Sequence, residues 1–289
     1  IQSEKMKSAI IILCLLSAAV LHAAPPGYVW HGKGDQSTRD KDGIYVWFVP
    51  GLSPLPGDYK VVGRLRSGHS GTFTLRAVDN FTGAERFSGA VKTSPAYADY
   101  EFGTLHYDGS WPIRLVDWNA PGYYIESVGL IPVNVPSVPE VRGSSADSSD
   151  GWIPMYHTKL AADPNMKKEG RGSLLVTVEP GSNVPWYDVG AMRRLNAAKA
   201  TMISFWIRFD DTPKPVWVQL IGGKESAVMR FRPEEFGIVR GEWKLVELPV
   251  SSFHFKPERD VATDIRGVAI CPETGKEKCV FRIDDLLLE

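Results

Sequence analysis

The sequence predicts an all-β fold: two tandem antiparallel jelly-roll β-sandwich domains that follow a signal peptide. Short runs rich in β-branched and aromatic residues recur beyond residue 26, and clusters of Gly, Pro, Asp and Asn separate them. Long stretches of helical periodicity are absent, which argues against helical and mixed folds. A length of 289 residues suits two domains of ordinary size.

The first 24 residues have the pattern of a secretory signal peptide. Lys5 and Lys7 give a positive start, residues 10–16 form an apolar core, and small residues at 23–24 suit cleavage. The apolar run is shorter than the roughly 20 residues that a membrane-spanning helix needs, although an uncleaved anchor is the alternative interpretation. We therefore expect export to a secreted, periplasmic or cell-surface location, with no membrane span after cleavage.

The charges of the chain are balanced, because 33 Lys and Arg residues stand against 34 Asp and Glu residues, a net charge of −1. No long basic run interrupts this balance, so the electrostatic footprint of a nucleic-acid-binding protein is missing. We expect no nucleic acid among the partners.

Two modules and a linker are expected along the chain. The first module, residues 25–134, should have strands near 43–49, 57–66, 71–78, 100–107, 111–117 and 123–133. Residues 135–150 space prolines with valines and then become rich in Ser and Asp, which is typical of a linker. The second module, residues 151–289, should have strands near 173–178, 201–209, 216–221, 227–231, 243–250, 265–271 and 279–288.

Alternation within the strands of the second module separates a core face from an outward face. In the run 201–209, for example, Phe205 and Ile207 point one way and Trp206 points the other. The outward residues combine flat aromatic surfaces with planar polar groups, which suits a sugar ring and its hydroxyls. The candidate ligand-binding residues, interpreted as one face, are Trp206, Arg208, Trp217, Gln219, Arg230 and Glu247. The alternative is that this face packs against the first module or a partner protein.

The second module resembles the galactose-binding-like jelly rolls found in many carbohydrate-binding modules of extracellular glycosidases. The resemblance rests on the stretches 172–176, 203–208, 241–253 and 281–286, which together span nearly all of residues 140–289. The first module shares only the looser pattern. The resemblance implies a sandwich that binds a poly- or oligosaccharide.

A structural calcium is also implied by this resemblance, because an acidic residue in the last strand of such modules often helps to hold one. Asp284 or Asp285 would then act with Asp147 and Asp150, since calcium prefers several carboxylate and carbonyl oxygens. Otherwise Asp284 and Asp285 are one inward polar group bonded to a loop and one exposed charge. No other cofactor is expected.

Two cysteines remain beyond the signal peptide, Cys271 and Cys279, and they flank a polar segment between two apolar runs. A disulfide across a hairpin is geometrically plausible in an exported protein. Two buried free thiols are the alternative, and the spacing fits no zinc site.

Arginines and aromatic residues stand out in the first module. Its outward arginines could meet acidic glycans or form an ordinary ion-paired surface; they are Arg64, Arg66, Arg76 and Arg114. Four aromatic residues lie around a turn at 119–122, and we expect them at the rim of a core rather than on a binding platform; they are Trp111, Trp118, Tyr123 and Tyr124.

Catalytic motifs are missing from the sequence: there is no HExxH, no Gly-x-Ser-x-Gly elbow and no phosphate-binding loop. The sequence therefore predicts an exported, non-catalytic protein that binds carbohydrate through the second module. A structural or adhesion protein that uses the same face for protein contact is the alternative. A weaker alternative is a glycan-active enzyme with a carboxylate pair, an option that Glu247 keeps open.

Overall fold

The computed structural model describes residues 27–31, 37–39, 45–49, 54–119, 122–136, 139–180, 189–222, 226–253 and 264–289. The signal peptide expected at residues 1–24 lies outside this part of the chain. Within the described part, no helix is both long and apolar enough to cross a membrane.

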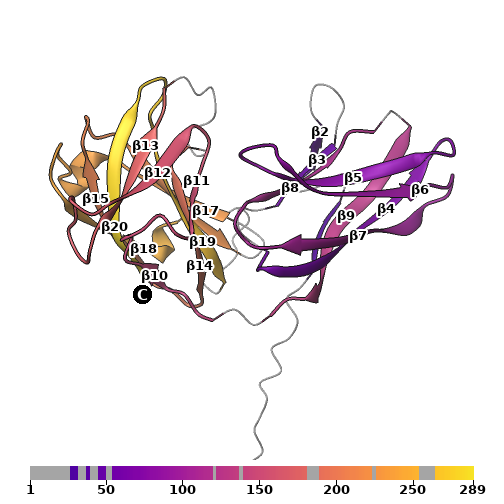
Figure 1. Ribbon diagram of the computed structural model, residues 1–289, viewed down its shortest axis with the longest axis horizontal. Coiled ribbons are helices and arrows are strands. Elements are labelled where there is room, and N and C mark those ends of the chain that lie inside the picture. The colour runs from indigo at the N-terminus through magenta and orange to yellow at the C-terminus, as the bar shows by residue number, and fades with distance from the viewer. Residues whose placement is uncertain are drawn as a thin grey trace, which may run out of the picture.

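Module 1 is a sandwich of two antiparallel sheets (Figure 1). Sheet 1a has the order β1-β9-β4-β7, formed by β1 (Tyr28–His31), β9 (Tyr123–Asn134), β4 (Gly57–Ser67) and β7 (Ala98–Tyr107). Sheet 1b has the order β2-β3-β8-β5-β6, formed by β2 (Ser37–Arg39), β3 (Tyr45–Phe48), β8 (Ile113–Asp117), β5 (Thr72–Asp79) and β6 (Glu85–Lys92).

Module 2 is a second antiparallel sandwich. Sheet 2a has the order β12-β13-β20-β15-β18, formed by β12 (Thr158–Asp163), β13 (Ser173–Val178), β20 (Cys279–Leu288), β15 (Met202–Phe209) and β18 (Lys244–Pro249), and β10 (Gly143–Ser144) also pairs with β20. Sheet 2b has the order β11-β14-β19-β16-β17, formed by β11 (Trp152–Pro154), β14 (Ala191–Ala197), β19 (Ile265–Pro272), β16 (Val216–Gly222) and β17 (Ser226–Phe231). Two short 3-10 helices flank β18, η2 (Pro233–Phe236) and η3 (Val250–Ser252). The predicted pair of antiparallel β-sandwiches is confirmed.

The two sheets of module 2 enclose one core, into which alternate residues of each strand point. Phe205 and Ile207 of β15 are fully buried in the same cluster as Val218 and Leu220 of β16. Burial of a side chain of this size contributes ~1.5–3 kcal/mol. The residues between them therefore point away from the core, on opposite sides of the sandwich for sheets 2a and 2b.

Part of the segment expected as linker belongs to module 2. Val141 pairs with Asn196 of β14, and β10 pairs with the end of β20. Ala146 is 1% exposed and lies in the module 2 core. Composition indicated a linker because Ser and Asp dominate here, but these polar residues surround a short run that completes sheet 2a.

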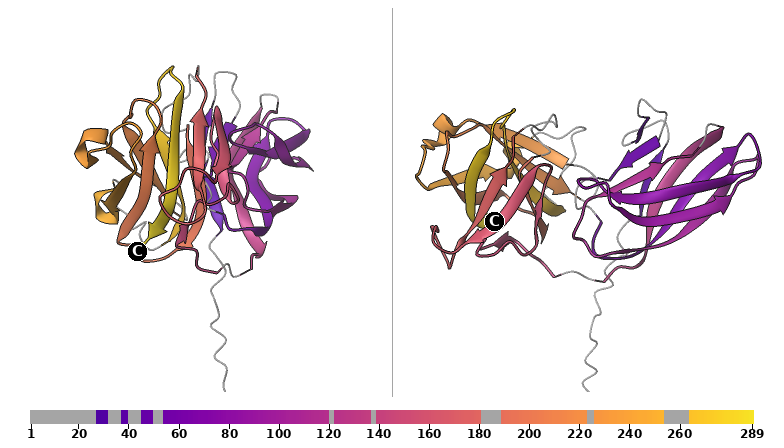
Figure 2. Two further views of the ribbon diagram at one scale, coloured as in Figure 1. Left: turned by 60° about the vertical axis from the view of Figure 1, so that its left-hand side comes forward. Right: turned by 45° about the horizontal axis from the view of Figure 1, so that its top comes forward.

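The two modules lie side by side and contact each other (Figure 2). Arg194 of β14 reaches into module 1, where its Nε donates to the carbonyl of Gly109 (3.0 Å), its Nη1 to that of Pro54 (3.1 Å) and its Nη2 to the Tyr107 hydroxyl (3.0 Å). A second contact joins the Tyr156 hydroxyl to the carbonyl of Asn80. Module 2 is thus fixed against module 1 at two places.

Replacing Arg194 with Ala should loosen the contact between the modules. Hydrogen bonds from a charged donor contribute ~1.5–3 kcal/mol each, and no neighbouring donor is placed to replace these three. We expect a larger radius of gyration in small-angle X-ray scattering and faster proteolysis between the two modules. Arg142→Ala is the matched control, because Arg142 bonds to Glu140 and Ala198 on its own side of the contact. Equal scattering from the two variants would contradict the docking role of Arg194.

Candidate functional site

The six predicted ligand-binding residues do not form one face. Trp206 and Arg208 lie on β15 and Glu247 on β18, which belong to sheet 2a, whereas the other three, Trp217, Gln219 and Arg230, lie on β16 and β17 of sheet 2b. Because the two sheets pack face to face, their outward residues point in opposite directions. The prediction of a single face is therefore wrong. β15 and β16 follow each other in the sequence, but they belong to different sheets.

The outer face of sheet 2a is covered by the chain's own connection between β12 and β13. The Lys168 ammonium lies 4.5 Å from the centre of the Trp206 ring, and Arg208 Nη1 donates to the Met166 sulfur at 2.7 Å. Glu247 is exposed on the edge strand β18, opposite Ser204. Trp206 is half-buried, as Trp217 is, and the Lys168 ammonium occupies one face of its ring.

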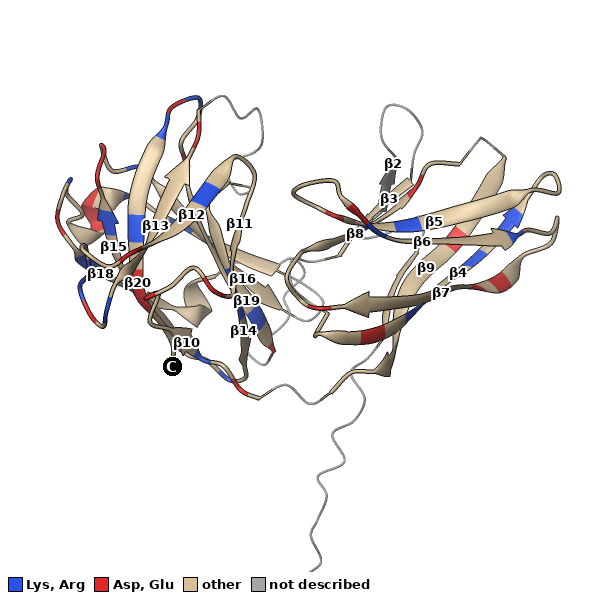
Figure 3. Cartoon of the chain, in the orientation of Figure 1, with Lys and Arg blue, Asp and Glu red and all other residues tan. Residues whose placement is uncertain are grey.

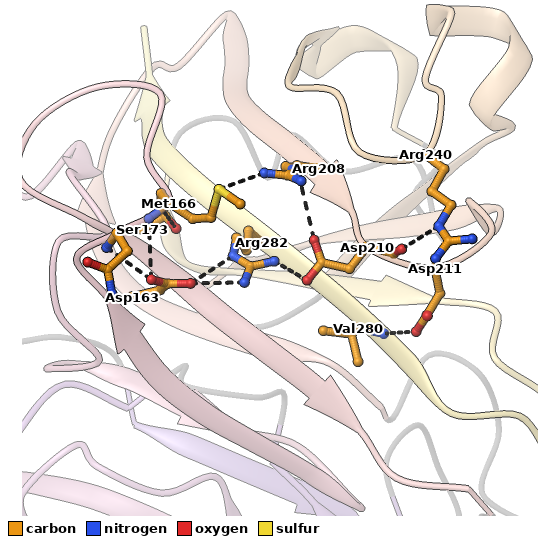
Figure 4. A network of polar contacts seen from close by, with 10 residues as sticks. Asp163, Met166, Ser173, Arg208, Asp210, Asp211, Arg240, Val280 and Arg282 are labelled. Carbon is orange, nitrogen blue, oxygen red and sulfur yellow. Dashed lines mark hydrogen bonds and ion pairs between the residues drawn. The ribbon is translucent and has the colours of Figure 1, made fainter.

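A network of charges lies beneath this connection (Figure 4). Arg282, only 8% exposed, donates to Asp163 from Nε (3.1 Å) and Nη2 (2.9 Å) and to Asp210 from Nη1. Burial raises the pKa of Asp163, but the hydrogen bond and charge of Arg282 and the backbone N–H groups of Asn165 and Met166 together outweigh burial and hold that pKa below its usual value. Glycoside hydrolysis needs one protonated acid and one free carboxylate. In this network one guanidinium donates to both carboxylates, so the two acids are not set apart from each other.

The outer face of sheet 2b carries an aromatic and polar group that we call the Trp217 cluster: Trp217, Gln219, Arg230 and Glu273. Trp217 lies opposite Arg230 in the register of β16 and β17, with the guanidinium 5.9 Å from the indole ring. Arg230 donates to Glu273 through Nε (2.7 Å) and Nη2 (2.9 Å), and Trp217 Nε1 donates to the same carboxylate. Gln219 lies two residues along β16, on the same side as Trp217. The indole and the guanidinium are thus both fixed by one carboxylate.

The contacts of the Trp217 cluster favour the ionised forms of both Glu273 and Arg230. The hydrogen bond from Arg230 lowers the pKa of Glu273, burial opposes this, and the bond from Trp217 adds to the lowering. The Glu273 bond in turn raises the pKa of Arg230. The side chains of Arg230 and Glu273 are 33% and 25% exposed, so the cluster is held in place and still open to solvent.

The centre of the same face is apolar and in contact with module 1. Its buried residues are Met155, Met192, Ile221, Ala269 and Cys271. Phe81 of module 1 packs against them from one side, and Trp217 packs against them as well. The Phe81 ring also meets Tyr156 edge to face, with centroids 5.2 Å apart. The alternative of packing against the first module therefore holds for the centre of this face, while the Trp217 cluster lies at its margin.

The predicted disulfide between Cys271 and Cys279 is not formed: both are buried thiols, as the alternative interpretation expected. The segment between them is no hairpin turn: it passes from β19 in sheet 2b to β20 in sheet 2a. Cys271 points outward from its sheet, 3.7 Å from the Met155 sulfur, whereas Cys279 points into the core. Burial raises the pKa of the Cys279 thiol to about 12.

Two of the four aspartates expected to bind calcium, Asp147 and Asp284, bond to the backbone of the connection between β12 and β13. Asp284 Oδ2 accepts the backbone N–H of Lys168 (2.7 Å) and of Glu169 (2.9 Å), and Asp147 Oδ1 accepts two further N–H groups of the same connection. Asp150 and Asp285 are exposed. In the described part of the chain no three acidic, His or Cys side chains are grouped as metal ligands. Calcium prefers several carboxylate and carbonyl oxygens, and its binding by these aspartates stays a prediction.

Asp284 and Asp285 instead match the alternative interpretation, one inward group bonded to a loop and one exposed charge. Asp284 is fully buried, and burial raises its pKa although three N–H donors oppose this. Together with Asp147 it ties residues 168–172 down over sheet 2a.

Two residues of these sites, Glu273 and Arg282, were not predicted from the sequence. Glu273 follows β19 and continues its outward alternation through Ala269 and Cys271, but it lies beyond the strand expected at 265–271, in the polar segment between the two cysteines. Arg282 also lies on an outward position, between the buried Phe281 and Ile283. Extending the alternation beyond each expected strand end would have found Glu273.

No family model matches the sequence, and no curated protein matches it. Among solved structures, the chain is similar to carbohydrate-binding modules. One is the N-terminal tandem CBM22-1–CBM22-2 domain of Xyn10C from Paenibacillus barcinonensis, with 13% identity and a TM-score of 0.35 over 92% of this chain and 97% of that chain. Another is the family 11 module from Clostridium thermocellum in complex with a β-1,3-1,4-mixed-linked tetrasaccharide, with 16% identity and a TM-score of 0.38 over 53% of this chain and 96% of that chain.

Acid should disrupt the Trp217 cluster at a pH below the ordinary pKa of glutamate. Because the pKa of Glu273 is lowered on folding, its stabilising contribution is complete above the unfolded value of about 4.3 and is lost as the pH falls through the folded value. We expect Glu273→Gln to lower the unfolding free energy by about 1 kcal/mol at neutral pH and by progressively less as the pH falls below the unfolded value. Urea unfolding across this range is the measurement. A cost that stays constant with pH would contradict the assignment.

Chelation should leave the fold of module 2 unchanged, because backbone donors occupy the carboxylates of Asp147 and Asp284. We expect equal melting temperatures in EDTA and in millimolar calcium. Asp284→Ala should cost about 1–3 kcal/mol by leaving buried N–H groups without an acceptor, and Asp284→Asn should cost less because it keeps an acceptor oxygen. A melting temperature that rises with calcium in the wild type and not in Asp284→Ala would overturn this account.

Proposed function

We propose that the chain is an exported, non-catalytic carbohydrate-binding protein and that the Trp217 cluster is its ligand site. The observation that carries this proposal is the shared carboxylate: Glu273 fixes the indole of Trp217 and the guanidinium of Arg230 side by side on one outward face. Export is supported by the signal-peptide pattern of residues 1–24.

The chemistry of the cluster suits a sugar. The aromatic plane of Trp217 can stack on the apolar face of a pyranose ring, and the amide of Gln219 and the outer N–H groups of Arg230 can bond to its hydroxyls. Because Glu273 already holds the indole and the guanidinium, binding loses little side-chain entropy. The absence of catalytic motifs from the sequence and the doubly bonded Arg282 network both support a non-catalytic role.

A structural or adhesion protein is the second candidate, favoured by the apolar centre of the same face. Phe81 already makes a protein contact there within the chain. A partner protein that displaced module 1 would find the same apolar patch. This candidate predicts protein binding that depends on Met192 and Ile221 rather than on Arg230.

Glycan binding by the mature protein is the experiment that tests the proposal, first on a glycan array and then by calorimetry with the glycans that bind. Xylohexaose and mixed-linked β-glucan oligosaccharides are useful first probes. Trp217→Ala should weaken binding by about tenfold or more, equal to ~1.4 kcal/mol. Trp206→Ala is the matched control, because Trp206 lies on the opposite sheet beneath Lys168, and it should leave affinity unchanged.

Three other results would argue against the proposal. Equal losses of glycan affinity in Trp217→Ala and Trp206→Ala would indicate a general loss of folding, which the melting temperatures would reveal. Binding of no glycan at all would favour the structural or adhesion role. Release of reducing sugars from a polysaccharide would instead establish an enzyme.

A further inference from the structure

Exposed aromatic side chains gather at one end of module 1, far from the Trp217 cluster in the sequence. Among the described residues, the aromatic side chains that are clearly exposed are Tyr97 (42%), Trp118 (48%) and Tyr124 (49%). Trp111 is buried and Tyr123 packs against the core, as expected for the rim of a core, whereas Trp118 and Tyr124 are about half exposed. All three exposed rings lie at the end of the sandwich where β4 and β8 end and β9 begins.

Tyr97 and Tyr124 flank one arginine. Arg66 lies opposite Tyr124 in the register of β4 and β9, and Leu65 lies opposite Ala98, which places Tyr97 on the other side of Arg66. The Arg66 guanidinium is 4.2 Å from the centre of the Tyr124 ring and 5.3 Å from that of Tyr97. The three side chains form a row across sheet 1a.

The neighbouring arginine on the same strand differs from Arg66. Arg64 pairs with Asp99 (3.3 Å) and Glu126 (3.2 Å), so it behaves as an ordinary ion-paired surface residue. Figure 3 shows basic and acidic residues side by side on β4, β7 and β9. Within the described ranges no carboxylate pairs with Arg66, which contacts only aromatic rings. Among the described residues, its positive charge is therefore left without a carboxylate partner.

The Arg66 guanidinium lies over both tyrosine rings, a position that leaves N–H donors for a ligand. Stacking on tyrosine engages the flat face of the guanidinium, whereas its N–H donors lie in its plane and point past the rings. A planar fork of this kind binds a carboxylate or a sulfate through two parallel hydrogen bonds. The exposed faces of Tyr97 and Tyr124 offer stacking surface for a pyranose ring on either side.

We propose that Arg66, Tyr97 and Tyr124 form a second binding site, specific for an anionic saccharide whose uronate carboxylate or sulfate pairs with Arg66. The site holds one anionic group at a time, because Asp99 and Glu126 occupy the next position along the strands. An extended polyphosphate backbone would meet these carboxylates, and the whole chain carries a net charge of −1, so nucleic acid is disfavoured. The site is independent of the Trp217 cluster.

The test is calorimetric titration of the mature full-length protein with three probes: trigalacturonate, a heparin-derived hexasaccharide and neutral maltohexaose. We expect binding of at least one anionic probe and no comparable binding of maltohexaose at this site. Binding of trigalacturonate would show that the Arg66 guanidinium accepts a carboxylate. Binding of the heparin hexasaccharide alone would show that it requires a sulfate. Arg66→Ala should weaken the anionic probe about tenfold or more, and Arg66→Lys should recover only part of the loss because a point charge cannot form the fork.

Two matched variants separate this site from general charge and from the site in module 2. Arg64→Ala removes the same charge two residues away and should change affinity by less than about threefold. Trp217→Ala should leave binding of the anionic probe intact even if it abolishes neutral glycan binding. Tyr124→Ala should weaken binding, whereas Tyr124→Phe should preserve it.

Several results would overturn the proposal. One is an equal loss of affinity for the anionic probe in Arg64→Ala and Arg66→Ala. Another is failure of both anionic probes to bind. A third is binding of poly-glutamate or of a single-stranded oligonucleotide as tight as that of the saccharide. Melting temperatures within the wild-type range establish that each variant is folded. Because Trp217 takes no part, failure here leaves the proposed function of module 2 standing, and the reverse also holds.

Discussion

Two β-sheets that share one core must present their remaining faces in opposite directions, and this constraint decides which side chains of module 2 can act together. Trp206 and Trp217 are separated by only a short stretch of sequence, yet one lies on sheet 2a and the other on sheet 2b. A ligand can therefore meet one of them, not both. What covers each outer face then determines which tryptophan is available.

The two faces are covered differently. On sheet 2a, Asp284 and Asp147 bond the backbone of residues 168–172, and the Arg282 network lies beneath the same connection. On sheet 2b, module 1 covers the centre through Phe81, and Arg194 holds the two modules together nearby. The Trp217 cluster remains at the margin, where it is ordered by Glu273 and still reached by solvent. Each outer face is thus partly covered, by the chain's own connection on sheet 2a and by module 1 on sheet 2b.

The sequence was sufficient for local features and insufficient for long-range ones. Alternation is a property of neighbouring residues, so the inward positions of Phe205 and Val218 were predicted correctly. The sheet that each strand joins depends on distant pairing, which is why the six-residue face and the cysteine hairpin failed. β6 and β12 were not predicted, because both are edge strands and their many exposed residues have the composition of a loop. The calcium hypothesis rested on residue type, whereas the backbone donors facing Asp284 are visible only in the fold.

The central claim is that the Trp217 face, and not the Trp206 face, meets the ligand. Titration of the tryptophan indole N–H signals by NMR, with the oligosaccharide that binds best on the array, tests this claim most directly. The account predicts a saturable shift of the Trp217 signal, whose donor bonds to Glu273, with the Trp206 signal unmoved. A saturable shift of Trp206 with Trp217 unchanged would contradict it.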